Sequence, residues 1–360
     1  MLQGNASSSV LQRIAGLDLG DIDSYVCILD RTSGEVIEES RIKTRPKDFQ
    51  AYFERHEAMQ VAIEVGTHSN WTSQLISTAG HAVTVANAAR VRLIHGGTRK
   101  NDRLDAEKLA RLLRYDRSLL APIQHRGMGT QHDLAVLRSR EALVKARTMH
   151  INHVRGIIKP FGARIPKCDT KAFAGIALQY IPPELLPAVT PHIEAIENLT
   201  RQINDLTRHV VELCRDKYPV TSVLTQVHGV AEITALTFIL TVEDPFRFRK
   251  SRDVAAYVGL VPGQKQSGAS DPARRITKAG DRQLRRLLVQ CAQRILGKRG
   301  IDSDLKRHGE RIASSGSKDA KRRAVVAIAR KLAVLLHCLW VTGEVYEPLR
   351  NSKRRSVPVS

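Results

Sequence analysis

The strongest constraint on the fold of this chain is the order of short strand-like and helix-like segments in its first 120 residues. Strand patterns occupy residues 13–20, 25–30, 35–43, 61–66 and 81–87, and helical patterns occupy residues 46–58, 69–80 and 102–115. The turn "RTSG" between the second and third strands favours an antiparallel pair. The order βββαβαβα predicts a mixed sheet with helices packed on it, which is an α/β domain.

Acidic residues stand at the ends of two of these strands. Asp18 closes the first strand in "GLDLG", and Glu64 lies near the end of the fourth in "AIEVG". If these strands are neighbours, the two carboxylates lie side by side at one edge. Asp102 and Asp105 in "NDRLDAEKLARLLR" are three residues apart and project from one helix face.

Such a group of carboxylates needs a cation, because four gathered negative charges repel one another and raise their pKa values. Oxygen ligands favour Mg²⁺ or Mn²⁺. Two such ions held about 4 Å apart would clamp the attacking and leaving oxygens of a phosphodiester. The pattern therefore predicts that Asp18, Glu64, Asp102 and Asp105 are metal ligands.

A plainer interpretation exists for each acid alone. Aspartate in the first turn of a helix is stabilised by the N–H groups there, and Asp21 and Asp23 are typical of a turn after the first strand. An acid at the end of an apolar strand such as "AIEVG" is harder to explain, because a buried unpartnered charge is costly. Taken together, the four acids favour a metal-binding cluster over four separate surface charges.

Charge is distributed unevenly along the chain. It carries 57 Lys and Arg against 36 Asp and Glu, a net charge of +21. Residues 1–100 hold 11 basic and 11 acidic side chains, whereas residues 261–360 hold 23 basic and 8 acidic ones. This gradient predicts a polyanionic partner for the C-terminal part. Nucleic acid is favoured over an acidic membrane, because the basic residues are interspersed with the apolar pattern of a folded domain.

The middle of the chain is helical. Residues 131–158 form a long amphipathic pattern, and a second apolar seam runs through residues 193–213. The two helices could form an antiparallel hairpin, a dimerising coiled coil or a spacer within one chain. The seam consists of Ile193, Ile196, Leu199, Ile203, Leu206, Val210 and Leu213.

The C-terminal third contains two further features. Residues 224–242 are typical of one helix-hairpin-helix turn, which can present backbone N–H groups to a phosphate. Residues 253–296 predict a short helix, a loop rich in Gly, Ser and Pro, and a strongly basic helix, with a disordered basic tail at 349–360.

The remaining composition indicates the compartment. Five scattered cysteines form no CxxC pair, which argues against a zinc site and a disulfide framework and fits a reducing cytoplasm. The first 16 residues lack the pattern of a secretory signal, and we expect no membrane span, because no apolar run approaches about 18 residues.

These motifs together resemble a known family. "GLDLG", "AIEVG", "KNDRLDAEKLARLL", "GLVPGQKQSGAS" and "ITKAGDRQLRRLL", in this order, resemble the DEDD transposases of bacterial insertion sequences, the family numbered one-ten. The resemblance extends from about residue 13 to residue 345. It implies a bridge-RNA-guided serine recombinase with a RuvC-like domain of the RNase H fold, a helical coiled-coil segment and a mainly α-helical transposase domain.

The resemblance also implies residue roles. Asp18, Glu64, Asp102 and Asp105 would be the DEDD acids, and Ser267 in "QKQSGAS" would be the nucleophile. The loop departs from the family's Ser-Ser-Gly-Gly form, since Gln266 and Ala269 replace a serine and a glycine, and Ser270 stays a competing candidate. The phosphate-binding cations would be Arg274, Arg275, Lys278, Arg282, Arg285 and Arg286.

The resemblance also implies four parts of the chain. Residues 1–125 would be the RuvC-like domain, 126–218 the helical spacer, 219–348 the transposase domain and 349–360 the tail. The implied partners are double-stranded donor and target DNA, a guide RNA, and further copies in a dimer or tetramer that shares active sites, in the bacterial cytoplasm at the nucleoid. Two alternatives stay open. One is a metal-dependent, structure-selective endonuclease that activates water, and the other is a nucleic-acid-binding scaffold without activity.

Overall fold

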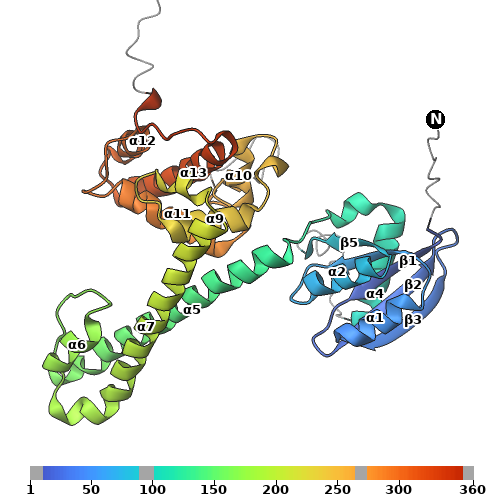
Figure 1. The fold of residues 1–360 in the computed structure, drawn as a ribbon, viewed down its shortest axis with the longest axis horizontal. Coiled ribbons are helices and arrows are strands. Elements are labelled where there is room, and N and C mark those ends of the chain that lie inside the picture. The colour runs from blue at the N-terminus through green and yellow to red at the C-terminus, as the bar shows by residue number, and fades with distance from the viewer. Residues whose placement is uncertain (1–10, 89–100, 264–273, 352–360) are drawn as a thin grey trace, which may run out of the picture. The chain divides into compact units, whose positions relative to one another are not determined.

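The computed structural model describes residues 11–88, 101–263 and 274–351 (Figure 1). The chain divides into two compact units, Met1–Arg126 and Gly127–Ser360. The first unit carries the predicted sheet, and the described part of the second is helical throughout its regular structure. The predicted mixed α/β domain followed by a mostly helical remainder is therefore confirmed.

The first unit is built on a five-stranded sheet with the order β3-β2-β1-β4-β5. β1, β2 and β3 pair antiparallel, while β4 and β5 run parallel to β1. The first and fourth strands are thus neighbours, as the placement of the acids required. The strands are β1 Arg13–Asp18, β2 Asp23–Asp30, β3 Val36–Lys43, β4 Gln60–Glu64 and β5 Ala82–Ala86.

Helices cover both faces of this sheet, because the buried strands alternate apolar residues toward both sides. One face packs against α4 through Ile14, Cys27, Leu29, Ala62 and Ala86. The other face, with Leu17, Val26, Ile28 and Ile63, packs against aromatic residues of α1 and apolar residues around α2. The helices are α1 Pro46–Glu54, α2 Ser69–Thr78 and α4 Asp102–Tyr115, followed by a 3-10 turn at Arg117–Leu120.

Predicted and observed boundaries agree in type and differ at the ends. The first and fourth strands end at Asp18 and Glu64, two residues earlier than predicted. The helix predicted at 46–58 ends at Glu54. These ends differ because hydrogen bonding, which the apolar pattern does not report, decides where an element stops.

The second unit begins with a long helical hairpin. α5 and α7 pack against each other in antiparallel fashion, since Arg140 donates to Thr207 (2.8 Å) and Arg147 donates to Thr200 (3.2 Å). Of the open alternatives, the described contacts are those of a hairpin within one chain. The elements of this region are α5 Met128–Ile157, α6 Phe173–Ala177, α7 Leu186–Asp216 and 3-10 turns at Lys159–Phe161, Leu178–Tyr180 and Pro183–Leu185.

The predicted seam of α7 separates into two rows. Ile193, Ile196, Ile203 and Val210 are buried, whereas Leu199, Leu206 and Leu213 are half-buried. The buried row faces α5 and the tip of the hairpin, where Ile151 and Val154 of α5 belong to the same apolar cluster as Ile193 and Ile196. The buried row of α7 therefore packs within the helical hairpin itself.

The C-terminal core gathers around α13. Leu284 and Leu288 of α11, Phe238 of α9, and Ile328 and Leu332 of α13 are fully buried in one cluster. The elements are α8 Thr221–Thr225, α9 Glu232–Val242, α10 Ser251–Tyr257, α11 Arg282–Ile295, α12 Asp304–Ala313 and α13 Lys318–Thr342, with a 3-10 turn at Pro245–Arg247.

One helix of the described chain, α13, is long and apolar enough to cross a membrane by length and composition. Its sequence contains Arg330 and Lys331, and 44% of its most apolar stretch is buried within the unit. The core helix of a soluble protein has the same properties. The two charged residues interrupt the apolar run of this helix, and the expectation of no membrane span stays a prediction.

Candidate active site and nucleic-acid surface

Asp18 and Glu64 stand at adjacent strand ends. The parallel register pairs Leu17 of β1 with Ile63 of β4, so the two acids follow at the same edge of the sheet. Each lies two residues beyond a position that faces α4, Gly16 in β1 and Ala62 in β4, and both therefore belong to the α4 face. Both side chains are half-buried.

The direction of α4 brings its first turn toward this edge. Arg114, near the end of the helix, donates to the carbonyl oxygens of Arg31 (2.8 Å) and Thr32 (2.7 Å) in the turn after β2. The strand register places that turn beside the start of β1. The other end of α4, which carries Asp105, consequently lies toward the end of β1.

The first turn of α4 has local partners. The side chain of Asn101 caps the helix by accepting from the backbone N–H of Arg103 (3.2 Å). Asp102 is exposed, while Asp105 is half-buried and accepts from the Lys108 ammonium (2.8 Å). Helix capping and the acid cluster are compatible, since the cap is made by a different residue.

The four predicted ligands do not form a closed metal site in the described structure. Among residues 11–88, 101–263 and 274–351, no group of three or more His, Cys, Asp or Glu side chains is placed to hold a metal ion. Asp18 and Glu64 share one edge, and Asp105 approaches the same face while bound to Lys108. Carboxylate oxygens on one face of the sheet are suitable ligands for a divalent cation. In the described structure they are not arranged to coordinate one.

The two neighbouring aspartates have other roles. Asp23 begins β2 and pairs with Lys43 (2.8 Å) and Arg41 (2.5 Å) of β3, and these hydrogen bonds lower the pKa of its carboxyl group. Asp21 lies in the bend after β1 with a side chain that is 94% exposed, and it meets His68 (3.1 Å). Both are therefore separate from the strand-end pair.

The sequence patterns missed His68, which follows β4 by four residues. Its Nδ1 accepts from the indole N–H of Trp71 (3.2 Å), so Nε2 carries the proton that is shared with Asp21 (3.1 Å). A lone histidine in "GTHSNW" has no distinctive spacing. The pair of His68 and Asp21 becomes visible only in the folded chain, where the segment after β4 meets the bend after β1.

The predicted nucleophile Ser267 and its competitor Ser270 lie outside the described residues. The chain on either side of them is held together by backbone bonds. Gly263 donates to the carbonyl oxygen of Arg275 (3.0 Å), and Thr277 donates to that of Val261 (2.9 Å). These bonds hold the described residues 261–263 beside residues 275–277.

Two glycines make this closure possible. Gly259 has a φ of +76°, and an added Cβ there would lie 2.2 Å from the carbonyl oxygen of Ala279. Gly280 has a φ of +72°, and its Cβ would lie 2.0 Å from the carbonyl oxygen of Tyr257. Side chains are excluded at both positions by backbone conformation and by space.

The predicted phosphate-binding cations differ in their surroundings. Arg274, Arg275 and Lys278 are exposed and line a cavity of about 1390 Å³, and Arg282 is exposed at the start of α11. Arg285 instead donates to the carbonyl oxygens of Val258 (2.9 Å) and Ala279 (2.7 Å). Arg286 pairs with Glu141 (3.1 Å) of α5. Arg285 and Arg286 thus serve internal contacts, which sequence spacing alone does not report.

The predicted helix-hairpin-helix segment is a turn between two helices. Gly229, with a φ of +89°, lies between α8 and α9. The turn and the end of α11 enclose a smaller cavity of about 620 Å³ that is lined by Arg294, Lys298 and Arg299. The turn therefore stands next to basic side chains.

Comparisons with known proteins agree with this arrangement. A family model of the DEDD transposases of IS110, described as transposase, matches residues 15–161, and a model described as transposase IS116/IS110/IS902 family matches residues 221–306. The first match covers the strand-end acids and α4. The second covers the hairpin turn, residues 264–273 and α11.

Curated relatives span most of the chain. The transposase for insertion sequence element IS1328 of Yersinia enterocolitica is 28% identical over 289 residues, which are 79% of this chain and 85% of that protein. The transposase for IS1111A of Coxiella burnetii is 28% identical over 69% of this chain and 68% of that protein. A putative transposase of Sinorhizobium fredii is 27% identical over 88% and 81%. The chain is thus similar to transposases of the IS110/IS116 family in both of its compact units.

Proposed function

We propose that this chain is an RNA-guided DNA transposase that cleaves and rejoins the DNA strands of an insertion sequence. The observation that carries the proposal is the placement of Asp18 and Glu64 at adjacent ends of β1 and β4, on the face toward which Asp105 is directed. The similarity to this family and the names of the relatives support DNA transposition as the activity.

A divalent cation, Mg²⁺ or Mn²⁺, would be held by Asp18, Glu64, Asp102 and Asp105. When bound, such an ion supplies electrostatic stabilisation of the charge that develops on a scissile phosphate. For Asp105 to join the set, its carboxylate has to exchange the Lys108 ammonium for the ion. Lys108 therefore stabilises Asp105 in the absence of a ligand.

Ser267 would be the nucleophile of strand cleavage. Its Oγ forms a bond to phosphorus, the bond from phosphorus to the deoxyribose oxygen breaks, and the proton of the hydroxyl passes to the leaving oxygen through a base or water. The resulting phosphoserine conserves the energy of the phosphodiester. A sugar hydroxyl of another strand can then reverse the step and release the serine without ATP.

Sequence selection would come from base pairing between a guide RNA and the donor and target DNA. The low aromatic content, 4%, is more consistent with backbone and shape contacts than with stacking of single-stranded bases on aromatic side chains. We also propose that acidic and serine-bearing domains of different copies cooperate in a dimer or tetramer. Residues 1–125 would be the RuvC-like domain, 126–218 the helical spacer and 219–348 the transposase domain.

The second candidate is a metal-dependent endonuclease in which the acids activate water. The variant Ser267→Ala separates the two functions, because it removes the covalent intermediate and leaves the acids in place. With a suicide substrate that traps a protein–DNA adduct, the wild-type chain should form the adduct and Ser267→Ala should not. Cleavage that survives in this variant, without any adduct in the wild-type chain, would favour the endonuclease.

The RNA component needs a separate experiment. The chain is purified with associated RNA from cells that carry the whole element, and the RNA is sequenced. Loops complementary to the element ends and to the insertion site support guidance by RNA. Recovery of only random cellular RNA would contradict it.

A further inference from the structure

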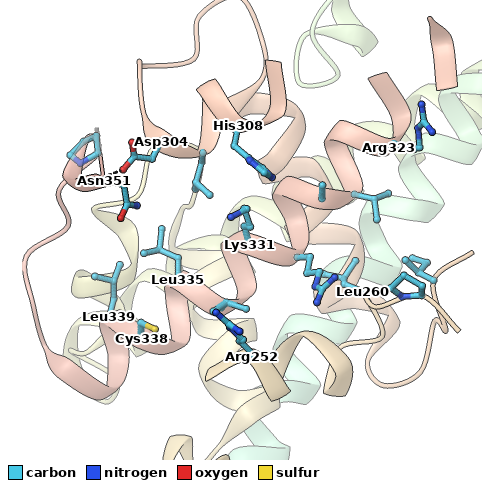
Figure 2. Close-up of a pocket in the computed structure, with 18 of the residues that line it drawn as sticks. Arg252, Leu260, Asp304, His308, Arg323, Lys331, Leu335, Cys338, Leu339 and Asn351 are labelled. Atoms are coloured by element: carbon cyan, nitrogen blue, oxygen red, sulfur yellow. Dashed lines mark hydrogen bonds between the residues drawn. The ribbon is translucent and has the colours of Figure 1, made fainter. Parts of the chain in front are cut away.

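The cavity that Pro262, Arg274 and Arg275 line has a basic wall. It lies among α10, α12, α13 and the segment around Tyr346, and Figure 2 shows His308 of α12 and Lys331 of α13 turned toward the same space. Three acidic side chains also line it. The Arg and Lys residues that line it are Arg252, Arg274, Arg275, Lys278, Arg322, Arg323, Arg330, Lys331 and Arg350.

Several of these cations are available to an external anion. Within the described chain, the side chains of Arg252, Arg323, Arg330 and Lys331 make no hydrogen bond or ion pair. Two of the three acids have partners, since Asp304 accepts from the backbone N–H of Asn351 (2.7 Å) and Asp319 pairs with Arg322 (3.6 Å). Gathered like charges without counterions are unfavourable until an anion binds.

The floor of the cavity is apolar. Along α13, Val326 and Ala327 are followed at a spacing of four by Arg330 and Lys331, and these by Val334 and Leu335. Residues three and four apart lie on one helix face, so a single strip of α13 offers apolar and cationic groups in turn. Leu260 extends the apolar surface.

We propose that this groove binds a single strand of DNA, with phosphates at Arg323, Arg330 and Lys331 and bases over the apolar strip. A cavity of about 1390 Å³ exceeds the roughly 300–1,000 Å³ of small-molecule sites. A duplex presents phosphates and hides the faces of its bases, so it would leave the strip in contact with water. An unpaired strand satisfies both parts of the groove.

The choice of DNA rests on the proposed function. One end of the groove is formed by Arg274 and Arg275, which adjoin residues 264–273, where the proposed nucleophile lies. A strand in the groove would thus contact the residues that follow the proposed nucleophile in the sequence. A flat anionic membrane is the less suitable partner, because the cations line a concave surface.

The direct test compares two double variants of the full-length chain. Arg330→Ala with Lys331→Ala removes two cations from the groove, and Lys318→Ala with Lys321→Ala removes two exposed cations of the same helix that do not line it. The probes are a fluorescent DNA 20-mer without self-complementarity and its duplex. Equal thermal unfolding of both variants verifies that each is folded.

We expect the groove variant to bind the single strand at least about tenfold more weakly, and its plot of log K against log salt to flatten by about 1.4. The control variant and the duplex should change by less than about threefold. A second variant, Val334→Thr, should weaken single-strand binding by about threefold without a change in salt slope, because it alters the apolar floor alone.

Three results would overturn the proposal. The first is an equal loss of DNA affinity in both double variants. The second is an equal loss of affinity for the duplex and for the single strand. The third is preferential binding of anionic vesicles or of an RNA 20-mer over the DNA strand through the groove. Binding requires no cleavage, so failure of the groove and failure of the proposed cleavage activity give different results. Groove-dependent binding without any Ser267 adduct would contradict the transposase mechanism and leave the groove assigned.

Discussion

Gly16 of β1 lies against the backbone of Ala106 in α4 so closely that a Cβ on the glycine would be 2.0 Å from the carbonyl oxygen of Ala106. The same Cβ would be 2.4 Å from the backbone nitrogen of Ala110. The contact sets the distance between the strand that ends at Asp18 and the helix that begins at Asp102 and carries Asp105. It therefore links the packing of the sheet to the geometry of the candidate site.

The first prediction concerns this contact. Gly16→Ala should lower the free energy of unfolding by about 3 kcal/mol, because both atoms that the methyl group meets belong to the backbone of a packed helix. Gly66→Ala is the control, since an added Cβ there has no neighbour within 4 Å. Urea unfolding followed by circular dichroism measures both. Similar stability of the two variants would show that α4 can move away from β1.

The second prediction concerns metal binding. Asp18→Asn and Glu64→Gln should each weaken Mn²⁺ binding by at least about tenfold, measured by calorimetry on the whole chain. Asp21→Asn, at the same edge but 94% exposed at its side chain, should leave the affinity unchanged. Equal effects of all three substitutions would mean that the edge attracts cations only through its net charge.

The third prediction concerns the base of the helical hairpin. Asp133 is buried and accepts from the Lys217 ammonium and the Tyr218 hydroxyl, each at 2.6 Å. Burial raises the pKa of Asp133, but these hydrogen bonds outweigh it and hold the pKa below its ordinary value. The stabilisation is present above the unfolded pKa of about 3.9 and is lost as the pH falls through the lower folded pKa.

Asp133→Asn should therefore cost about 2 kcal/mol of stability at pH 7 and reduce the loss of stability below pH 4. Urea titrations at pH 7 and pH 3 give the comparison. Asp216→Asn removes an acid whose partner, Arg215, is also exposed, and it should change stability little. An unchanged acid dependence in Asp133→Asn would assign the acid sensitivity to other carboxylates.

The fourth prediction separates two arginines of α11. Arg285→Met should lower the free energy of unfolding by about 2 kcal/mol, because it leaves the carbonyl oxygens of Val258 and Ala279 without their donor. Arg282→Ala should instead weaken DNA binding severalfold with no change in unfolding, since Arg282 is exposed. Fluorescence anisotropy and thermal unfolding test each variant, and reversed effects would reject this division of roles.

Much of the fold follows from patterns that neighbouring residues carry. Alternation and apolar runs predict all five strands and their adjacent helices, and the spacing of Leu284 and Leu288 predicts the buried face of α11. The strand-end positions of Asp18 and Glu64 also follow, because the order of elements makes β1 and β4 neighbours. Local hydrogen bonding and side-chain periodicity suffice for these features.

Contacts between distant residues decide the rest. The sequence shows a row of arginines in residues 274–286, but only the packed chain shows that Arg285 holds two carbonyl groups while Arg274 and Arg275 line a cavity. The hydropathy pattern of α13 fits a core helix or a membrane span, and its burial beside α11 identifies the core helix.

Local patterns along the chain specify which elements form and which acids end the strands. Packing between distant segments specifies which charges are neutralised, by Lys108 at Asp105 and by Glu141 at Arg286, and which stay exposed in a groove. The two kinds of feature differ because the interactions behind them act over different distances along the chain. Secondary structure depends on neighbours a few residues apart, whereas the availability of a charge depends on every segment that folds back against it.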